Sequence, residues 1–122
     1  MRRILTVDDS TSMRQMVRAT LQSAGYGVVE AADGQEALEF ARDNAVDLVI
    51  SDVNMPRMDG ITLVTELRAL PGYRLTPLLL LTTESSQDKK LEGKRAGATG
   101  WIVKPFNPTQ LLSTLTKLFG TV

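Results

Sequence analysis

Short aliphatic runs alternate with segments of helical periodicity along the whole chain, and this alternation constrains the fold more than any other feature. The helical segments gather apolar residues on one face, as Met13, Val17 and Leu21 do. Strands that alternate with helices form parallel sheets covered on both faces. The 122 residues therefore predict one α/β domain over residues 1–122, a doubly wound, five-stranded parallel sheet with five helices. Strands are expected at residues 4–7, 27–30, 48–50, 78–81 and 101–103.

Capping residues mark the ends of several predicted helices. Ser12 and Gln15 fit a capping box at the start of the first helix, and Gly25 fits its end. Asp33 is expected to cap the second helix. Asn107, followed by a proline at the first helical position, is expected to cap the last one.

The fourth predicted helix, residues 86–96, has a weak pattern. It contains one strongly apolar residue, Leu91, and an internal glycine, Gly93, so we expect a marginally held and largely exposed helix. It also lies in the basic part of the chain, because residues 85–122 carry a net charge of +4 and residues 1–84 a net charge of −4. A partner surface and a solvated helix face explain these charges equally well.

The composition excludes several kinds of chemistry. The chain has no histidine and no cysteine, which removes the commonest general base, the commonest zinc ligands and disulfides. Its formal net charge is zero, which gives no indication of nucleic-acid binding. No apolar run approaches the roughly 20 residues of a membrane span, and the N-terminus does not fit a signal peptide. We therefore expect a cytoplasmic protein that binds neither nucleic acid nor membrane.

Polar residues follow four of the predicted strands at the point where each ends. The first strand is followed by Asp8 and Asp9, and the third by Asp52; the fourth is followed by Thr82, Thr83 and Glu84, and the fifth by Lys104 and Pro105. Right-handed crossovers bring the carboxyl ends of parallel strands to one edge of the sheet, where ligands of such folds bind. These side chains are therefore expected to share one pocket.

Three carboxylates in one pocket repel one another and require a cation. A like-charge pair about 4 Å apart costs on the order of 4 kcal/mol at an effective dielectric constant of 20. Lys104 can neutralise one charge, and the rest suits a hard divalent ion such as Mg²⁺. Asp8 or Asp52 alone would be read as a helix cap, and Thr82 or Lys104 alone as an ordinary strand-end residue. Their joint placement favours a phosphoryl-binding site in which a carboxylate can act as nucleophile.

Four segments, "ILTVDDS", "DLVISDVNMPRMDG", "LLLLTTE" and "GWIVKPF", together resemble response-regulator receiver domains of the CheY type along the whole chain. The resemblance implies a flavodoxin-like, CheY-like fold and a phosphoprotein that takes a phosphoryl group from a histidine kinase. Asp52 matches the family's acceptor aspartate. Such a protein is not an enzyme in the usual sense, since it catalyses only transfer to its own aspartate and its own dephosphorylation.

The family's metal and phosphoryl ligands also have counterparts in this chain. By the resemblance, Asp9 would ligate Mg²⁺ directly and Asp8 mainly through water, and Asp52 and the backbone carbonyl of Asn54 would complete the protein ligands. Lys104 matches the lysine that pairs with the phosphoryl group, and its bond to Pro105 resembles the family's cis peptide.

The resemblance further assigns residues to switching and to signal lifetime. Thr82 matches the hydroxyl that follows the phosphoryl oxygen inward, and Trp101 occupies the position of an aromatic residue that then rotates inward. Trp is bulkier than the usual Tyr or Phe, so a Trp101 that never switches is the competing interpretation. Asn54 and Glu84 match positions that tune dephosphorylation. The chain departs from the pattern at two further positions, Val53 and Thr83.

The expected partners follow from the same resemblance. They are a CheA-like histidine kinase, an output protein such as a FliM-like flagellar switch protein that binds around Trp101 and the fourth helix, and a phosphatase. We expect a monomer that acts in two-component chemotaxis and flagellar motility. A phosphorelay shuttle uses the same site and is the first alternative. A haloacid-dehalogenase-type hydrolase is the second, although adjacent Asp8 and Asp9 do not fit its D-x-D nucleophile motif and the chain is short for a cap domain.

Overall fold

The computed structural model describes residues 2–83, 87–104 and 107–119, and within them the expected five-stranded parallel sheet is present. The strands lie in the order β2-β1-β3-β4-β5, and each neighbouring pair is parallel. The order reverses direction between β1 and β3, which makes the carboxyl ends of these two strands the topological switch point. The strands are β1 (Arg3–Val7), β2 (Gly27–Ala31), β3 (Leu48–Asp52), β4 (Leu78–Thr82) and β5 (Gly100–Val103).

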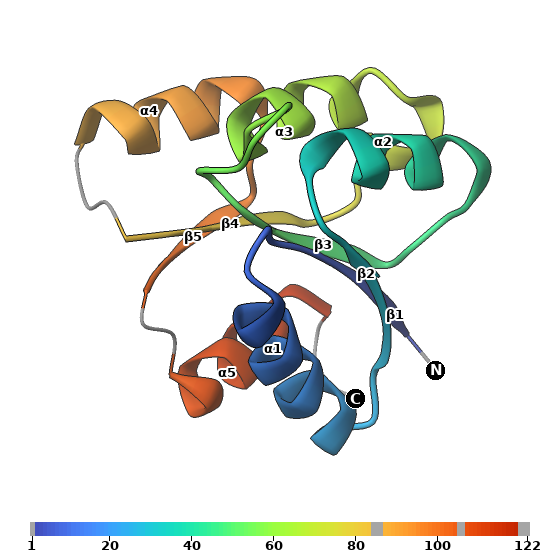
Figure 1. Cartoon of the computed structure of the whole chain (residues 1–122), viewed down its shortest axis with the longest axis vertical. Coiled ribbons are helices and arrows are strands. Elements are labelled where there is room, and N and C mark those ends of the chain that lie inside the picture. The colour runs from blue at the N-terminus through green and yellow to red at the C-terminus, as the bar shows by residue number, and fades with distance from the viewer. Residues whose placement is uncertain (1, 84–86, 105–106, 120–122) are drawn as a thin grey trace.

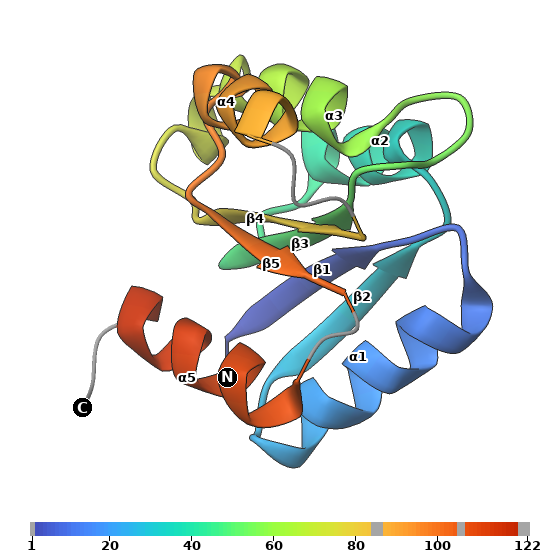
Figure 2. The same cartoon turned by 90° about the vertical axis from the view of Figure 1, so that its left-hand side faces the viewer.

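The helices form two layers, one on each face of the sheet (Figures 1 and 2). Helices α2, α3 and α4 cover one face, and α1 and α5 cover the other. Within the described ranges, no helix combines the length and the apolar character that crossing a membrane requires. The helices are α1 (Thr11–Ser23), α2 (Gly34–Asp43), α3 (Gly60–Arg68), α4 (Gln87–Ala96) and α5 (Pro108–Phe119), and a short 3-10 helix, η1 (Pro71–Tyr73), precedes β4.

The period of two along the central strands separates two hydrophobic cores. Leu78 and Leu80 of β4 point into the core under α2 and α3, whereas Leu79 and Leu81 point into the core under α1 and α5. Every residue of β3 and β4 is buried. Two strands buried on both faces form a rigid centre, and this centre holds the residues at their carboxyl ends in place.

Two of the central strands run further than expected. β3 continues through Ser51 to Asp52, because these residues pair in register with Leu80 and Leu81 of β4. β4 continues to Thr82, because Thr82 pairs in register with Val103 of β5. Asp52 is therefore the last residue of a buried strand. Its backbone is fixed by the sheet, which limits the positions that its carboxylate can take.

Most of the predicted helix caps are confirmed. The Asp33 side chain accepts from the Glu36 N–H, and the Asn107 side chain accepts from the Gln110 N–H at 3.1 Å. The capping box at Ser12 is wrong, because α1 begins at Thr11 and Ser12 lies inside the helix. Ser10 has extended backbone angles and accepts from the Met13 N–H at 3.2 Å, so Ser10 is the N-cap.

Helix α4 is exposed on most of its surface, as predicted, but its contact with the sheet differs from expectation. The apolar Leu91 is 47% exposed, whereas Gly93 is the buried residue of the helix. A Cβ atom at Gly93 would lie 2.7 Å from Cζ3 of Trp101 and 2.9 Å from Cδ1 of Leu80. Gly93 lowers the helix propensity of this segment, and it is also the position where α4 approaches β5 and β4.

Candidate functional site

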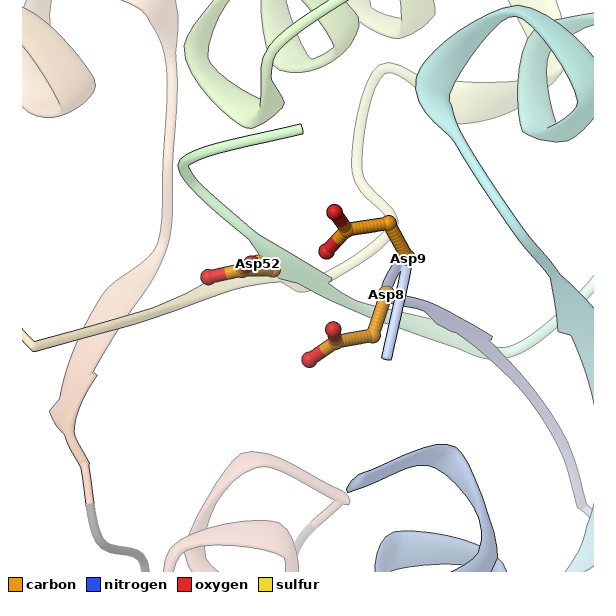
Figure 3. A group of neighbouring side chains, drawn as sticks. All are labelled: Asp8, Asp9 and Asp52. Atoms are coloured by element: carbon orange, nitrogen blue, oxygen red, sulfur yellow. The ribbon is translucent and has the colours of Figure 1, made fainter. Parts of the chain in front are cut away.

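The acidic residues meet at the carboxyl edge of the sheet, at the switch point between β1 and β3. These strands are neighbours, with Val7 paired to Ser51, so the residues that follow the pair, Asp8 and Asp52, lie side by side. Figure 3 shows the side chains of Asp8 and Asp9 beyond the end of β1 and that of Asp52 at the end of β3. One carboxylate oxygen of each residue lies within 4.8 Å of the others.

Lys104 supplies a positive charge to this acidic cluster. Its Nζ atom lies 3.1 Å from Oδ1 of Asp52 and 3.3 Å from Oδ2 of Asp8, and its side chain is 13% exposed. The backbone N–H of Lys104 also donates to the Thr82 carbonyl at 2.7 Å, which joins the end of β5 to the end of β4. The ammonium therefore bridges two carboxylates that burial and proximity would otherwise leave uncompensated.

Burial dominates the protonation behaviour of the acceptor candidate. Burial raises the pKa of Asp52, the charge of Asp8 raises it further, and the contact with Lys104 offsets part of this effect. For Lys104, burial by itself lowers the pKa, but the attraction and hydrogen bond of Asp52, followed by those of Asp8, outweigh it and raise the pKa. The lysine is thus a protonated cation. Its charge does not fully offset the effects of burial and of Asp8 on the carboxylate of Asp52.

The turn that carries Asp8 and Asp9 is held by two contacts. Oδ1 of Asp8 accepts from the Ser10 N–H at 2.9 Å, and the carbonyl of Asp8 accepts from Nη1 of Arg14 at 2.5 Å. The Nε atom of Arg14 in turn lies 3.3 Å from Oε1 of Glu30 on β2. Arg14 is not among the residues predicted from the sequence, and the one signal that could have found it is its position one turn into α1, six residues after Asp8.

The ligand set fits a hard divalent cation. All three side chains offer carboxylate oxygens, and Asp8 and Asp52 are buried while Asp9 is exposed to solvent. Mg²⁺ favours one or two carboxylates together with retained waters, which the exposed side of this cluster permits. The single charge of Lys104 leaves two negative charges on the three carboxylates, and these would attract such an ion.

Glycine is required where the segment after β3 turns back toward the acceptor. A Cβ atom at Gly60 would lie 2.2 Å from the carbonyl oxygen of Asp52. The Gly60 N–H donates to the Val53 carbonyl at 2.9 Å, and the Val53 N–H donates to the Leu81 carbonyl at 3.0 Å. Asn54 is exposed in this segment, two residues beyond Asp52.

The two residues expected to switch occupy neighbouring strands. Thr82 ends β4 and is fully buried, in register with Val103 of β5. Trp101 is partly buried, and its ring packs against α4 at Gly93. Its Nε1 atom is buried and has no hydrogen-bond partner among the residues that the structure describes.

The structure describes only some of the remaining sequence-predicted positions. Thr83 is exposed and Val53 is buried. Glu84, expected to tune dephosphorylation, and Pro105, expected to follow a cis peptide bond, lie outside the described residues. The structure therefore brings together Asp8, Asp9, Asp52 and Lys104, and it places Thr82 at the adjoining strand end.

Comparison with known proteins agrees with this geometry. The profile of the response regulator receiver domain matches residues 4–116. The chain is 39% identical to the chemotaxis protein CheY1 of Helicobacter pylori strain J99 over 121 residues, 98% of each chain. It also superposes on the structure of Vibrio cholerae chemotaxis protein CheY4 with a TM-score of 0.93 and 57% identity, covering 97% of this chain and 98% of that one.

A second similar structure was solved with a bound ion. The response regulator TrrA of Thermotoga maritima, solved in complex with Mg²⁺-BeF, has a TM-score of 0.87 and 35% identity, with 97% of this chain and 99% of that one covered. The chain belongs to the response regulator receiver domain family. Receiver domains are signalling proteins, and the five-stranded parallel sheet described above is the fold that this chain shares with them.

Proposed function

We propose that this protein accepts a phosphoryl group on Asp52 from a histidine kinase in a Mg²⁺-dependent reaction. The observation that carries the proposal is the bridge of Lys104 between Asp52 and Asp8, beside the three clustered carboxylates. An isolated helix cap needs neither a second carboxylate nor a buried lysine. A site that receives a dianionic phosphoryl group needs both a nucleophile and positive charge next to it.

The groups present account for each bond that forms and breaks in the proposed transfer. A carboxylate oxygen of Asp52 attacks the phosphorus of the kinase phosphohistidine as the phosphorus–nitrogen bond breaks, and the electron pair returns to the imidazole. Lys104, which already contacts Oδ1 of Asp52, pairs with an oxygen of the transferred group. When bound by Asp8, Asp9, Asp52 and the carbonyl of Asn54, Mg²⁺ would supply positive charge to the phosphoryl oxygens. Because the chain has no histidine, the donor is a partner protein.

The output surface that we propose surrounds Trp101. A groove of about 240 Å³ is bordered by Lys90, Lys94 and residues 98–101. Its lysines favour an acidic or amphipathic partner peptide. Movement of Thr82 toward a phosphorylated Asp52, followed by rotation of Trp101, would change the shape of this groove, while Asn54 and Glu84 set how fast water removes the phosphoryl group.

The biological role that fits best is control of flagellar direction in chemotaxis. The Helicobacter pylori and Vibrio cholerae relatives are chemotaxis proteins, and both are matched over almost their full length. The partners would be a CheA-like kinase, a FliM-like switch protein and a phosphatase, with a cytoplasmic monomer as the active form. A phosphorelay shuttle would use the same site without requiring a partner peptide at the groove.

Asp52→Asn tests the acceptor. The variant should fold and take up no stable label from phosphorylated kinase or from acetyl phosphate, whereas Asp43→Asn, which removes an exposed carboxylate of α2, should be labelled like the wild type. Stable labelling of Asp52→Asn would show that another residue is the acceptor. Multiple turnover of small phosphate esters by the wild type would instead favour the hydrolase.

A binding experiment separates the switch from the shuttle. Trp101 is the single tryptophan, so its fluorescence reports directly on the proposed output surface. A spectral change with Mg²⁺ and beryllofluoride together, and not with Mg²⁺ alone, together with tighter binding of a switch-protein peptide, would support the switch. The same peptide affinity with and without beryllofluoride would favour the shuttle.

A further inference from the structure

The segment between β3 and α3, residues 53–59, contains a strained turn. The Met58 N–H donates to the Pro56 carbonyl at 2.7 Å, and the intervening Arg57 has a φ of 66°. A γ-turn with positive φ at its central residue is rare and strained, and Arg57 is the one non-glycine residue with positive φ in the described parts of the chain. Such a turn persists only where surrounding contacts stabilise it.

The side chain of Arg57 makes the contact that can stabilise this turn. Its Nε atom donates to Oδ2 of Asp33 at 3.0 Å, and its Nη2 atom donates to the same oxygen. The Asp33 side chain is 7% exposed, whereas that of Arg57 is 66% exposed. The buried carboxylate of Asp33 is therefore the fixed partner of this ion pair, and it determines where the guanidinium of Arg57 lies.

Asp33 serves two segments with one carboxylate. Its Oδ1 accepts from the Glu36 N–H at 2.9 Å and so caps α2, while its Oδ2 receives the guanidinium of Arg57. The hydrogen bond from the Glu36 backbone, and next the one from Arg57, lower the pKa of Asp33. The start of α2 and the strained turn are thus attached to the same group.

Two close backbone approaches hold the segment, one at Met58 and one where Gly60 meets Asp52. A Cβ atom at Gly34, the first residue of α2, would lie 2.6 Å from the carbonyl oxygen of Met58. Gly60, which follows the segment, approaches the carbonyl of Asp52, which precedes it, as described above. Asn54 lies in the stretch of backbone between Asp52 and Met58, the two points held in this way, so a displacement at Arg57 is transmitted to it.

We propose that Arg57 is a positioning residue for the phosphoryl-acceptor site. Through its ion pair with Asp33 it holds residues 53–59, and hence the carbonyl of Asn54, in place beside Asp52. The effect on the loop stands on the contacts above, whereas the effect on Mg²⁺ affinity rests on the proposed function.

Four variants separate the ion pair from the backbone strain. Arg57→Ala removes the guanidinium and keeps an unfavourable φ, whereas Arg57→Gly removes the guanidinium and also relieves the φ. Asp33→Asn removes the charge but retains a good N-cap residue. Arg42→Ala, at the exposed opposite end of α2, is the control for loss of one positive charge.

Two readouts are taken on each full-length variant. The first is amide hydrogen exchange of Met58 and Gly60 in metal-free protein, because these two N–H groups close the turns of the segment. The second is the Mg²⁺ dissociation constant by isothermal titration calorimetry. Unfolding by urea is measured in parallel, so that a general loss of stability is recognised.

We expect faster exchange at both amides, and Mg²⁺ binding weakened about tenfold, in Arg57→Ala, Arg57→Gly and Asp33→Asn, with Arg42→Ala unchanged. Compared with Arg57→Ala, Arg57→Gly should be more stable toward urea, because the strain at φ is relieved, but should bind Mg²⁺ no more tightly. If Arg57 had a purely structural role, Mg²⁺ affinity would recover together with stability. Exchange and affinity equal to the wild type in the three variants would overturn the proposal. If wild type and Arg42→Ala bind no Mg²⁺ while the exchange pattern holds, the loop role of Arg57 stands and the proposed function fails.

Discussion

The Nζ atom of Lys104 lies 3.1 Å from Oδ1 of Asp52, yet this contact does not bring the pKa of Asp52 down to its ordinary value. Burial of the carboxylate and the charge of Asp8 outweigh the lysine. The native state therefore holds Asp52 in an ionised form that costs free energy. A site in this condition has unused affinity for further positive charge, which is the property that an Mg²⁺-dependent acceptor needs.

Asp52→Asn should stabilise the metal-free protein at neutral pH. Burial and the charge of Asp8 disfavour the ionised form of Asp52 in the folded chain and not in the unfolded chain, so a neutral amide at this position should increase the free energy of unfolding. Because the folded pKa is raised above 3.8, this increase disappears as the pH falls through the folded pKa toward 3.8. Urea unfolding of the two proteins at pH 7 and at pH 3.5 measures the difference.

The sign of that difference decides the prediction. A wild type that is as stable as Asp52→Asn at pH 7, or an advantage of the variant that grows on acidification, would contradict it. Asp43→Asn serves as the control, because its exposed carboxylate should show little change at either pH.

Lys104→Met should destabilise the metal-free protein by about 2 kcal/mol. The methionine keeps the length of the side chain and removes the charge that bridges Asp52 and Asp8, which leaves two neighbouring buried carboxylates without their cation. Lys117→Met, which changes an exposed lysine on α5, is the matched control and should have a small effect. Equal urea midpoints for Lys104→Met and the control would show that the bridge contributes nothing.

Much of this site could be predicted because it depends on local patterns. Aliphatic strands that end in acidic residues locate Asp8 and Asp52, and the rule that parallel strands share a carboxyl edge brings them together. The pairing of Arg57 with Asp33 could not be predicted in this way, since 24 residues separate them and neither lies at a strand end. Such contacts are set by how α2 and α3 pack, which a pattern of apolar residues does not specify.

The misassigned cap of α1 and the interpretation of Gly93 have a similar origin. Ser10 and Ser12 offer the same hydroxyl, and the choice between them depends on where the Asp8 turn, held by Arg14, allows the helix to begin. Gly93 has the same weak helix propensity in any sequence window. Its role becomes visible only when the ring of Trp101 lies against it.

Asp9→Ala should raise the melting temperature of the metal-free protein and weaken Mg²⁺ binding. Removing one of three clustered carboxylates reduces their repulsion, but Asp9 is exposed and its charge is screened, so we expect an increase of about 2 °C that is largest at low salt. With excess Mg²⁺ the order should reverse, because the ion stabilises the wild type more. Calorimetric melting at two salt concentrations tests this; a metal-free melting temperature that is unchanged or lower would argue against repulsion in the cluster.

Gly93→Ala should destabilise the protein by about 1 kcal/mol and change the fluorescence of Trp101. Alanine favours a helix by about 1 kcal/mol over glycine, but its Cβ would press on Cζ3 of Trp101 and Cδ1 of Leu80, and overpacking of this kind costs about 1–3 kcal/mol. Gly72→Ala, where nothing lies within 4 Å of the new Cβ, should be neutral and is the control.

The same substitution in a Trp101→Val background shows whether the contact is responsible. Valine has no atom at the position of Cζ3, so Gly93→Ala should then cost less than in the wild type, by an amount that a double-mutant cycle measures from four urea unfolding curves. A coupling energy of zero would mean that the glycine is not needed to accommodate the ring. A clear coupling would show that the position of α4 depends on that of Trp101, which is the physical link that an output surface formed by the two requires.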